Sequence, residues 1–207
     1  MLKKKMFRDI RKNLSQFVAI FLMVFLGILV YAGIRSYMDG MKETADVFYK
    51  ENNLQDLNML GYGFSLDDLN KVKQIKNVQN AERKLAVMAK MESDEDRTLQ
   101  VNFIEANNIS KFYVMDGIEF DINNDGVWMD NFYAKNNNLK IGDEITIKYD
   151  GISFTRKLVG LINVPDHVYD IKDESELFPT HDNYGFVYLS VNSFPEEYIT
   201  NNIMKEY

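Results

Sequence analysis

A run without a single charged side chain, residues 13–34, constrains this chain more than any other feature. Residues 17–34 within it are almost wholly apolar, and a helix needs about 20 such residues to cross a hydrocarbon core about 30 Å thick. We therefore expect a transmembrane helix over residues 13–34. The basic residues that precede it, opposed only by one acid, are Lys3, Lys4, Lys5, Arg8, Arg11 and Lys12.

The basic cluster predicts the direction in which the helix crosses the membrane. Lys and Arg close to a span stay in the cytoplasm, so we expect residues 1–12 to form a cytoplasmic foot in the cell membrane, with the chain after about Arg35 outside. The net charge of the whole chain is −7, so the part beyond the foot is strongly acidic. Because nucleic-acid binding needs a basic face, we expect the lipid bilayer, and no nucleic acid, as a partner.

A cleaved signal peptide is the main alternative for the apolar run. It has the same basic start, and residues 30–32 (Val-Tyr-Ala) resemble a small-residue cleavage site. The run is longer than the usual core of about 7–15 residues in a signal peptide, which favours a retained anchor. The chain has no cysteine, so its exterior part can form neither disulfides nor thiolate metal sites.

Residues 35–53 predict a stalk that continues the spanning helix outward. Their apolar residues Tyr37, Met41, Ala45 and Phe48 are spaced by three and four, as on one face of a helix. Such a stalk either transmits motion through the membrane or simply holds the exterior part off the bilayer. The sequence favours the two interpretations equally.

Residues 54–207 predict a mixed α+β extracytoplasmic domain. Its first half contains a strand at 54–63 that ends in glycines, and a short helix whose N-terminus carries a capping-box pair, Ser65 and Asp68. A hairpin follows, with one strand within residues 78–92, a charged turn at 93–97, and a second strand at 99–103, where apolar and polar residues alternate.

The second half begins near Asp116 and Gly117. Asp150 and Gly151 form a dipeptide that is typical of hairpin turns, so we expect strands on both sides of it. The expected elements are strands at 127–129, 144–149, 152–163 and 184–191, a helix at 131–138, a turn at 140–143, and a polar loop at 165–179.

Two stretches of this half resemble motifs of the FtsX-like permeases, including the MacB type, of bacterial ABC transporters. Residues 128–147 (WMDNFYAKNNNLKIGDEITI) are similar to a helix and turn that lead into a strand, and residues 158–190 carry Val-Gly-Leu, Pro-acid-x-Val-Tyr, Pro-x-His and Tyr-Gly-Phe elements. The order of foot, span, stalk and exterior domain extends the resemblance over nearly the whole chain. The matching positions are Ala134, Leu139, Ile141, Gly142, Asp143, Gly160, Pro165, Tyr169, Pro179, His181, Tyr184, Gly185 and Phe186; Val164 and His167 depart from the pattern, which has Ser and an aromatic residue there.

The resemblance implies a permease subunit that works with a cytoplasmic ABC ATPase and with further permease segments. ATP hydrolysis would occur in the ATPase, so this chain would be no enzyme and would need no cofactor, and its exterior domain would move for export or mechanotransmission. The family has at least four spanning helices, so we expect the N-terminal portion of a longer permease with an incomplete exterior domain. The alternative is a single-span, membrane-anchored binding or sensing domain; an exterior enzyme is the weakest hypothesis.

Other patterns that could carry chemistry have simpler interpretations. Residues 121–126 match the start of an EF-hand loop, but the twelfth position, which should be a bidentate Glu, is Phe132, so a plain turn is favoured. The two histidines, His167 and His181, have no recognised zinc spacing and predict loop hydrogen bonds. We expect Trp128, Phe132 and Tyr133 to fill a core rather than to form a binding surface, and we expect no metal site.

Overall fold

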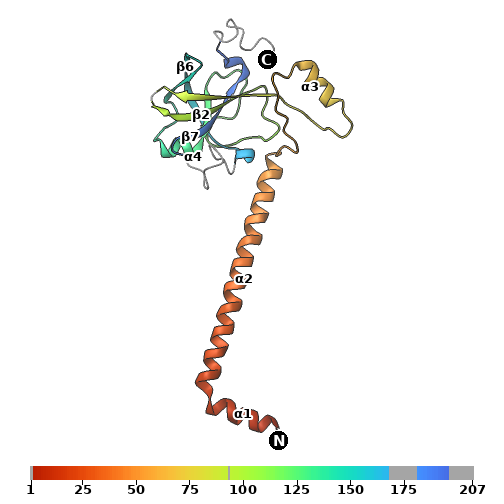
Figure 1. The fold of residues 1–207 in the computed structure, drawn as a ribbon, viewed down its shortest axis with the longest axis vertical. Helices are drawn as coiled ribbons and strands as arrows, with labels where there is room; N and C mark the ends of the chain where they lie inside the picture. The colour runs from red at the N-terminus through yellow and green to blue at the C-terminus, as the bar shows by residue number, and fades with distance from the viewer. Residues whose placement is uncertain (1, 93, 168–180, 196–207) are drawn as a thin grey trace. The chain divides into compact units, whose positions relative to one another are not determined.

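The computed structural model describes residues 2–92, 94–167 and 181–195 (Figure 1). Two units make up the chain, Met1–Phe48 and Tyr49–Tyr207. Tyr169 and Pro179, two of the motif positions, lie outside the described residues, as does most of the loop expected at 165–179.

The first unit is helical throughout the residues described. Helix α1 (Leu2–Lys12) ends at Asn13, and α2 (Leu14–Glu51) follows as one continuous helix. The helices predicted for the apolar run and for the stalk are therefore a single element. Among the described residues α2 is long and apolar enough to cross a membrane, a property that a signal sequence near an N-terminus shares.

The chain between α2 and the sheet carries one short helix, α3 (Leu66–Lys73). Its capping box forms as predicted: the Ser65 hydroxyl accepts from the Asp68 N–H, and the Asp68 carboxylate accepts from the Ser65 N–H at 3.1 Å. The Ser65 hydroxyl also donates to the Asp68 carboxylate at 2.7 Å, and this bond, followed by the bond from the Ser65 N–H, lowers the pKa of Asp68. The strand predicted for residues 54–63 is wrong, because no described strand pairs with this segment, and Leu60 and Tyr62 are almost fully exposed.

The sheet of the second unit closes on itself. Together with the short helices beside it, this sheet gives the domain an α+β architecture. The strand order is β3-β6-β4-β7-β2-β1-β5, and β5 also pairs with β6, so every strand except β3 belongs to a closed ring. Two pairings, β2 with β7 and β4 with β6, are parallel. The strands are β1 (Lys84–Met91), β2 (Asp94–Ile104), β3 (Tyr113–Gly117), β4 (Val127–Asp130), β5 (Glu144–Tyr149), β6 (Ile152–Asn163) and β7 (Tyr184–Ser190).

Most predicted strands are confirmed, with two corrections. The hairpin β5–β6 turns at Asp150 and Gly151, which both have positive φ, as a tight hairpin turn requires. The charged residues 94–97 were expected in a turn but belong to β2, where they continue the strand that pairs with β1. Strand β3 was not predicted. Helix α4 (Asn131–Asn136) and two short 3₁₀ helices, Pro165–His167 and Val191–Ser193, complete the described elements near the sheet.

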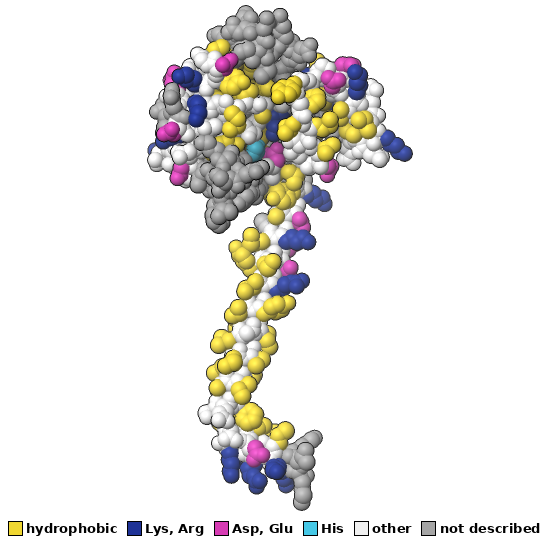
Figure 2. Space-filling model, in the orientation of Figure 1, with side chains coloured by type: hydrophobic (Ala, Val, Ile, Leu, Met, Phe, Trp, Pro, Cys, Tyr) yellow, Lys and Arg dark blue, Asp and Glu magenta, His cyan; other side chains and the backbone are white. Residues whose placement is uncertain are grey.

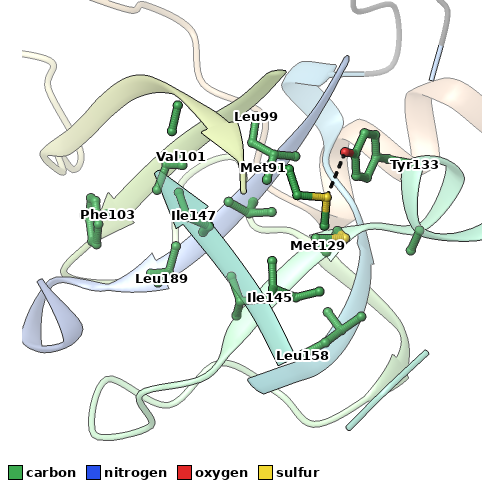
Figure 3. Close-up of a cluster of buried hydrophobic side chains, with 14 residues drawn as sticks. Met91, Leu99, Val101, Phe103, Met129, Tyr133, Ile145, Ile147, Leu158 and Leu189 are labelled. Carbon is green, nitrogen blue, oxygen red and sulfur yellow. Dashed lines mark hydrogen bonds between the residues drawn. The ribbon is translucent and has the colours of Figure 1, made fainter. Parts of the chain in front are cut away.

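One buried cluster fills the inside of the ring (Figure 3). Alternate residues of the ring strands point into it, as the period of two along a strand requires. Tyr133 and Ala134 of α4 close one part of it, and the Tyr133 hydroxyl lies 3.6 Å from the Met91 sulfur. Fully buried members include Leu99, Val101, Val127, Met129, Ile147, Leu158, Val187 and Leu189.

A second cluster lies on the opposite face of β4, β6 and β7. We call it the outer cluster, and we call the cluster inside the ring the inner cluster. Trp128, Phe186 and Tyr188 alternate in sequence with residues of the inner cluster, so they point away from it. Phe112 is fully buried against them, with its ring centroid 6.2 Å from Trp128 and 5.4 Å from Tyr188. The core role expected for Trp128 and Tyr133 is thus confirmed, although the two belong to different clusters. The same expectation is wrong for Phe132, whose side chain is 52% exposed.

Candidate functional site

The two motif stretches pack against each other, and two glycines permit the contact. A Cβ added to Gly185 of β7 would lie 2.5 Å from the Tyr133 ring of α4. A Cβ added to Gly160 of β6 would collide with the Trp128 ring of β4. Each glycine of the second stretch therefore makes room for an aromatic ring of the first.

The turn at residues 140–143 attaches the first stretch to β6. The Asp143 carboxylate accepts from the Lys140 N–H at 2.8 Å, and Gly142 has a φ of +99°, which favours glycine. The Gly142 N–H donates to the Leu158 carbonyl, and the Leu158 N–H donates to the Asp143 carbonyl, both at 2.8 Å. Two of the remaining positions have packing roles, since Ala134 is buried and Leu139 packs on the inner cluster, whereas Ile141 is exposed.

A buried carboxylate, Asp130, joins the two stretches electrostatically. It accepts from the N–H groups of Phe132 and Tyr133 at 3.2 and 3.0 Å, which caps α4, and its Oδ2 lies 3.2 Å from Nδ1 of His181. Burial raises the pKa of Asp130, while these bonds and His181 act in the opposite direction. The neighbouring Asp182 binds the Asn136 amide at 3.0 Å, so residues 181–182 are held along α4.

The other motif residues of the second stretch line the outer cluster or the sheet. The Tyr184 hydroxyl donates to the Gln100 Oε1 at 3.0 Å. Pro165 is buried, and His167 stacks on Phe186 with ring centroids 4.4 Å apart. The departure at His167 from the family pattern thus keeps a flat ring on Phe186.

The alternatives for metal binding gain no support from the geometry. Asp121 accepts from the Asn123 N–H at 2.9 Å, and Asn124 accepts from the Gly126 N–H at 2.7 Å, as in ordinary Asx turns. Within residues 2–92, 94–167 and 181–195, no group of three or more His, Cys, Asp or Glu side chains could hold a metal ion.

The basic residues predicted to set orientation lie on α1 or at its end. Lys4, Lys5, Arg8, Arg11 and Lys12 are exposed. Their effect on orientation stays a prediction.

The sequence did not reveal a joint between the end of α2 and the sheet domain. Asn53 follows the helix with a φ of 49°, a left-handed residue that ends the helix, and its Nδ2 donates to the Asn108 carbonyl at 2.7 Å. The N–H groups of Ser110 and Lys111 donate to the carbonyls of Asn53 and Asn52, both at 2.8 Å. All of these residues belong to the second unit.

The joint continues into the sheet and the outer cluster. The Glu82 carboxylate, two residues before β1, accepts from the Asn108 side chain at 2.8 Å and from the Ile109 N–H at 3.2 Å. Phe112, fully buried in the outer cluster, follows the same loop. The paired Asn residues 52–53 and 107–108 were a usable signal, because Asn adopts left-handed backbone and bonds to nearby main chain readily.

Comparisons with known proteins found similar solved structures but no matching family model or curated sequence. One similar solved structure is the extracellular domain of the ABC-type transporter YknZ from Gram-positive bacteria, with 15% sequence identity, a TM-score of 0.46 and 70% of each chain covered. Another is the periplasmic region of MacB from Actinobacillus actinomycetemcomitans, with 11% identity, a TM-score of 0.37, and 68% of this chain and 58% of that chain covered. These structural neighbours are of the kind that the sequence motifs resemble.

Proposed function

We propose that this chain is the N-terminal portion of an ABC transporter permease that couples a cytoplasmic ATPase to movement of an extracytoplasmic domain. The product of that coupling is export of a cargo or mechanical control of an exterior partner. The proposal begins from the motif order along the sequence and from the continuous helix α2.

The length of α2 supports a lever rather than a simple anchor. Its 38 residues correspond to about 57 Å of helix, whereas the hydrocarbon core is about 30 Å thick. Roughly 25 Å of helix therefore remains beyond a span that begins near its start. The uncharged run contains no ionisable group that could serve an ion path or a proton relay, so the coupling is conformational.

The joint at Asn53 is the observation that carries the proposal. A flexible tether would leave the end of the helix unbonded, but here three hydrogen bonds join residues 52–53 to residues 108–111. The same loop leads to the buried Phe112. A displacement of the last turn of α2 would thus pull directly on the outer cluster.

The exposed stripe of the outer part of α2 supports the presence of further permease segments. Its apolar residues Ile34, Met38, Met41, Ala45 and Phe48 repeat with alternating steps of four and three, the spacing of a helix–helix seam. Ile34, Met38 and Met41 are more than half exposed. Such a seam fits a second helix that rises from the same membrane.

The first test measures the mass of the native protein and identifies the proteins that are bound to it. An antibody against residues of the exterior domain would be used on native membranes, followed by mild detergent extraction and purification. We expect a species far above 24.2 kDa together with an ABC ATPase. A species near 24.2 kDa without an ATPase would overturn the proposal and favour the single-span binding or sensing alternative.

The second test addresses coupling in that purified complex. A short Gly-Ser insertion between Glu51 and Asn52, which separates α2 from the residues of the joint, should abolish transport or partner activation while basal ATP hydrolysis continues. The same insertion in the exposed hairpin turn after Asp150 is the matched control and should leave coupling intact. Equal coupling in both variants would exclude the joint as a transmitting element.

A further inference from the structure

We propose that α1 is a binding site for anionic phospholipid headgroups, which it contacts while lying in the membrane interface with its apolar face against the acyl chains. The inference rests on the proposed function in one respect, since it requires residues 13–34 to span a bilayer. It gives a ligand class and contact residues to a segment that the sequence linked only to orientation.

The first observation is an exposed apolar face on a very short helix. Met6 and Phe7 lie four and three residues before Ile10, which places all three on one side of α1. Met6 is 55% and Phe7 67% exposed. An exposed apolar face next to a bilayer gains free energy by entering the boundary of the acyl chains.

The second observation is the charge of the opposite face. Lys4, Arg8 and Arg11 are spaced by four and three, and Lys5 and Lys12 lie beside them, so the helical period places these cations away from Met6 and Ile10. Figure 2 shows Lys and Arg side chains along one side of α1 and hydrophobic side chains on the other. A helix with one apolar and one Lys- and Arg-rich face is typical of helices that lie in the membrane plane.

The third observation is the break at Asn13. The Asn13 N–H donates to the carbonyls of Asp9 and Ile10 at 3.1 and 3.2 Å, and its own carbonyl accepts from Gln16 and Phe17 at 3.1 and 3.2 Å. One residue thus ends α1 and begins α2, and Figure 1 shows α1 turning away from the axis of α2. A helix that continued straight along the span could not bring its apolar face to the lipid, whereas a turned helix can.

Distance and charge together select an anionic lipid as the occupant. The 11 residues of α1 span about 16 Å, so every cation lies within roughly two Debye lengths of the headgroups at physiological salt. Clustered Lys and Arg next to a span are attracted to anionic lipids, and Lys and Arg bind phosphate strongly. A zwitterionic headgroup offers no net charge to this cluster.

The test uses the complete chain reconstituted in lipid vesicles without any other protein. Because the chain has no cysteine, the single substitutions Phe7→Cys, Arg8→Cys and Gly27→Cys can each carry one fluorophore. The vesicles consist of phosphatidylcholine with or without phosphatidylglycerol, and quenching is compared between a lipid-borne and an aqueous quencher. With phosphatidylglycerol we expect the lipid-borne quencher to act at position 7 and the aqueous quencher at position 8. Without phosphatidylglycerol we expect the difference in quenching between the two positions to be several-fold smaller.

A charge variant and a matched control test whether the cations of α1 cause the dependence on anionic lipid. The double substitution Lys4→Gln and Lys5→Gln should reduce the effect of phosphatidylglycerol on position 7 several-fold. Asp9→Asn removes the acid of α1, keeps its cations and should retain the effect.

Three results would overturn the inference. The first is equal aqueous quenching at positions 7 and 8 while Gly27→Cys is quenched from the lipid. This result would reject the inference but would not contradict the span or the proposed function. The second is a contrast that does not depend on phosphatidylglycerol. The third is aqueous quenching at Gly27→Cys, which would reject the span, and with it the proposed function as well.

Discussion

At the scale of single residues, two glycines set the packing of the motif stretches. Gly185→Ala places a methyl group 2.5 Å from the Tyr133 ring, so either the ring or β7 must shift. We expect the free energy of unfolding of the sheet domain to fall by about 1–3 kcal/mol, the usual effect of overpacking a dense core. Urea titration of the full chain, followed by the fluorescence of its one tryptophan, the buried Trp128, measures the change.

Gly40→Ala is the control for that substitution. No atom outside the helix backbone lies within 4 Å of a Cβ built there, and Gly40 belongs to α2, so the tryptophan transition should stay at its wild-type position. An unchanged unfolding transition in Gly185→Ala would mean that the Tyr133 ring can move aside without a loss of stability.

Asp130 gives a prediction for pH. Burial raises its folded pKa above the ordinary aspartate value of 3.8, so the folded state holds this proton more tightly than the unfolded state. The stabilisation is complete below pH 3.8 and is lost as the pH rises through the folded pKa. Relative to wild type, the Asp130→Asn variant should therefore gain stability from pH 3.5 toward neutral pH, because its amide never ionises and its oxygen still caps α4.

The measurement is the difference in unfolding free energy between the two proteins across that range, again from Trp128 fluorescence. His181→Gln serves as the companion variant, since it removes a contact that opposes the raised pKa of Asp130, and should steepen the pH dependence. Parallel pH curves for wild type and Asp130→Asn would contradict the prediction.

At the scale of elements, the joint after α2 can be divided into backbone and side-chain contributions. Asn53→Gly keeps the left-handed backbone and removes the bond to the Asn108 carbonyl, so we expect a local loss of about 0.5–1.5 kcal/mol. Asn53→Ala adds the strain of a left-handed alanine, about 1–2 kcal/mol more. Hydrogen exchange at the amides of Ser110 and Lys111, which donate into the joint, should accelerate in that order.

A left-handed asparagine elsewhere provides the control. Asn77, with a φ of 75°, lies in the connection between α3 and β1, so Asn77→Ala carries the same backbone strain at another place. It should leave exchange at Ser110 unchanged. Acceleration there in Asn77→Ala would mean that the whole connection, and not the joint, controls these amides.

Local chemistry decided which elements the sequence could predict. The turn pair at residues 150–151 and the capping box at Ser65 act within a few residues, so β5, β6 and α3 could be located from the sequence. The closure of the ring depends on pairings between strands that are distant in sequence, such as the parallel pairing of Thr98 in β2 with Tyr184 in β7, which no local pattern encodes. The unpaired segment 54–63 has apolar residues typical of a strand, but no described strand pairs with it.

The same limit applies to the candidate site. Motif positions such as Gly160 and Gly185 could be identified by resemblance, whereas their aromatic partners, Trp128 and Tyr133, became evident only from the packing. The contact between Asp130 and His181 joins residues from the two stretches, and neither residue has a local pattern that predicts the other.

At the scale of the whole molecule, the charge on α1 makes a prediction about topology. Replacing Lys3, Lys4, Lys5, Arg8, Arg11 and Lys12 with glutamine should scramble orientation, because Lys and Arg flanking a span hold their side in the cytoplasm. Glu119→Cys is an exposed position on a chain without other cysteines. An impermeant thiol reagent on intact cells should label it in the otherwise unchanged protein and less in the neutralised variant.

Lysed cells provide the reference for full labelling at Glu119→Cys. Labelling that appears only after lysis in the otherwise unchanged protein would place the sheet domain in the cytoplasm and contradict the predicted orientation.

The position of β7 in the ring has a consequence for biogenesis. This strand comes last among the described strands, yet it lies between β2 and β4 and all seven of its residues are buried. In the proposed exterior location, β2 and β4 present open edges until residue 190 has crossed the membrane, and the two hydrophobic clusters lack the strand that separates them. A chain threaded through the membrane from its N-terminal side must therefore keep about a hundred translocated residues from aggregating, which makes dependence on an exterior chaperone or on rapid secretion an expected property of this architecture.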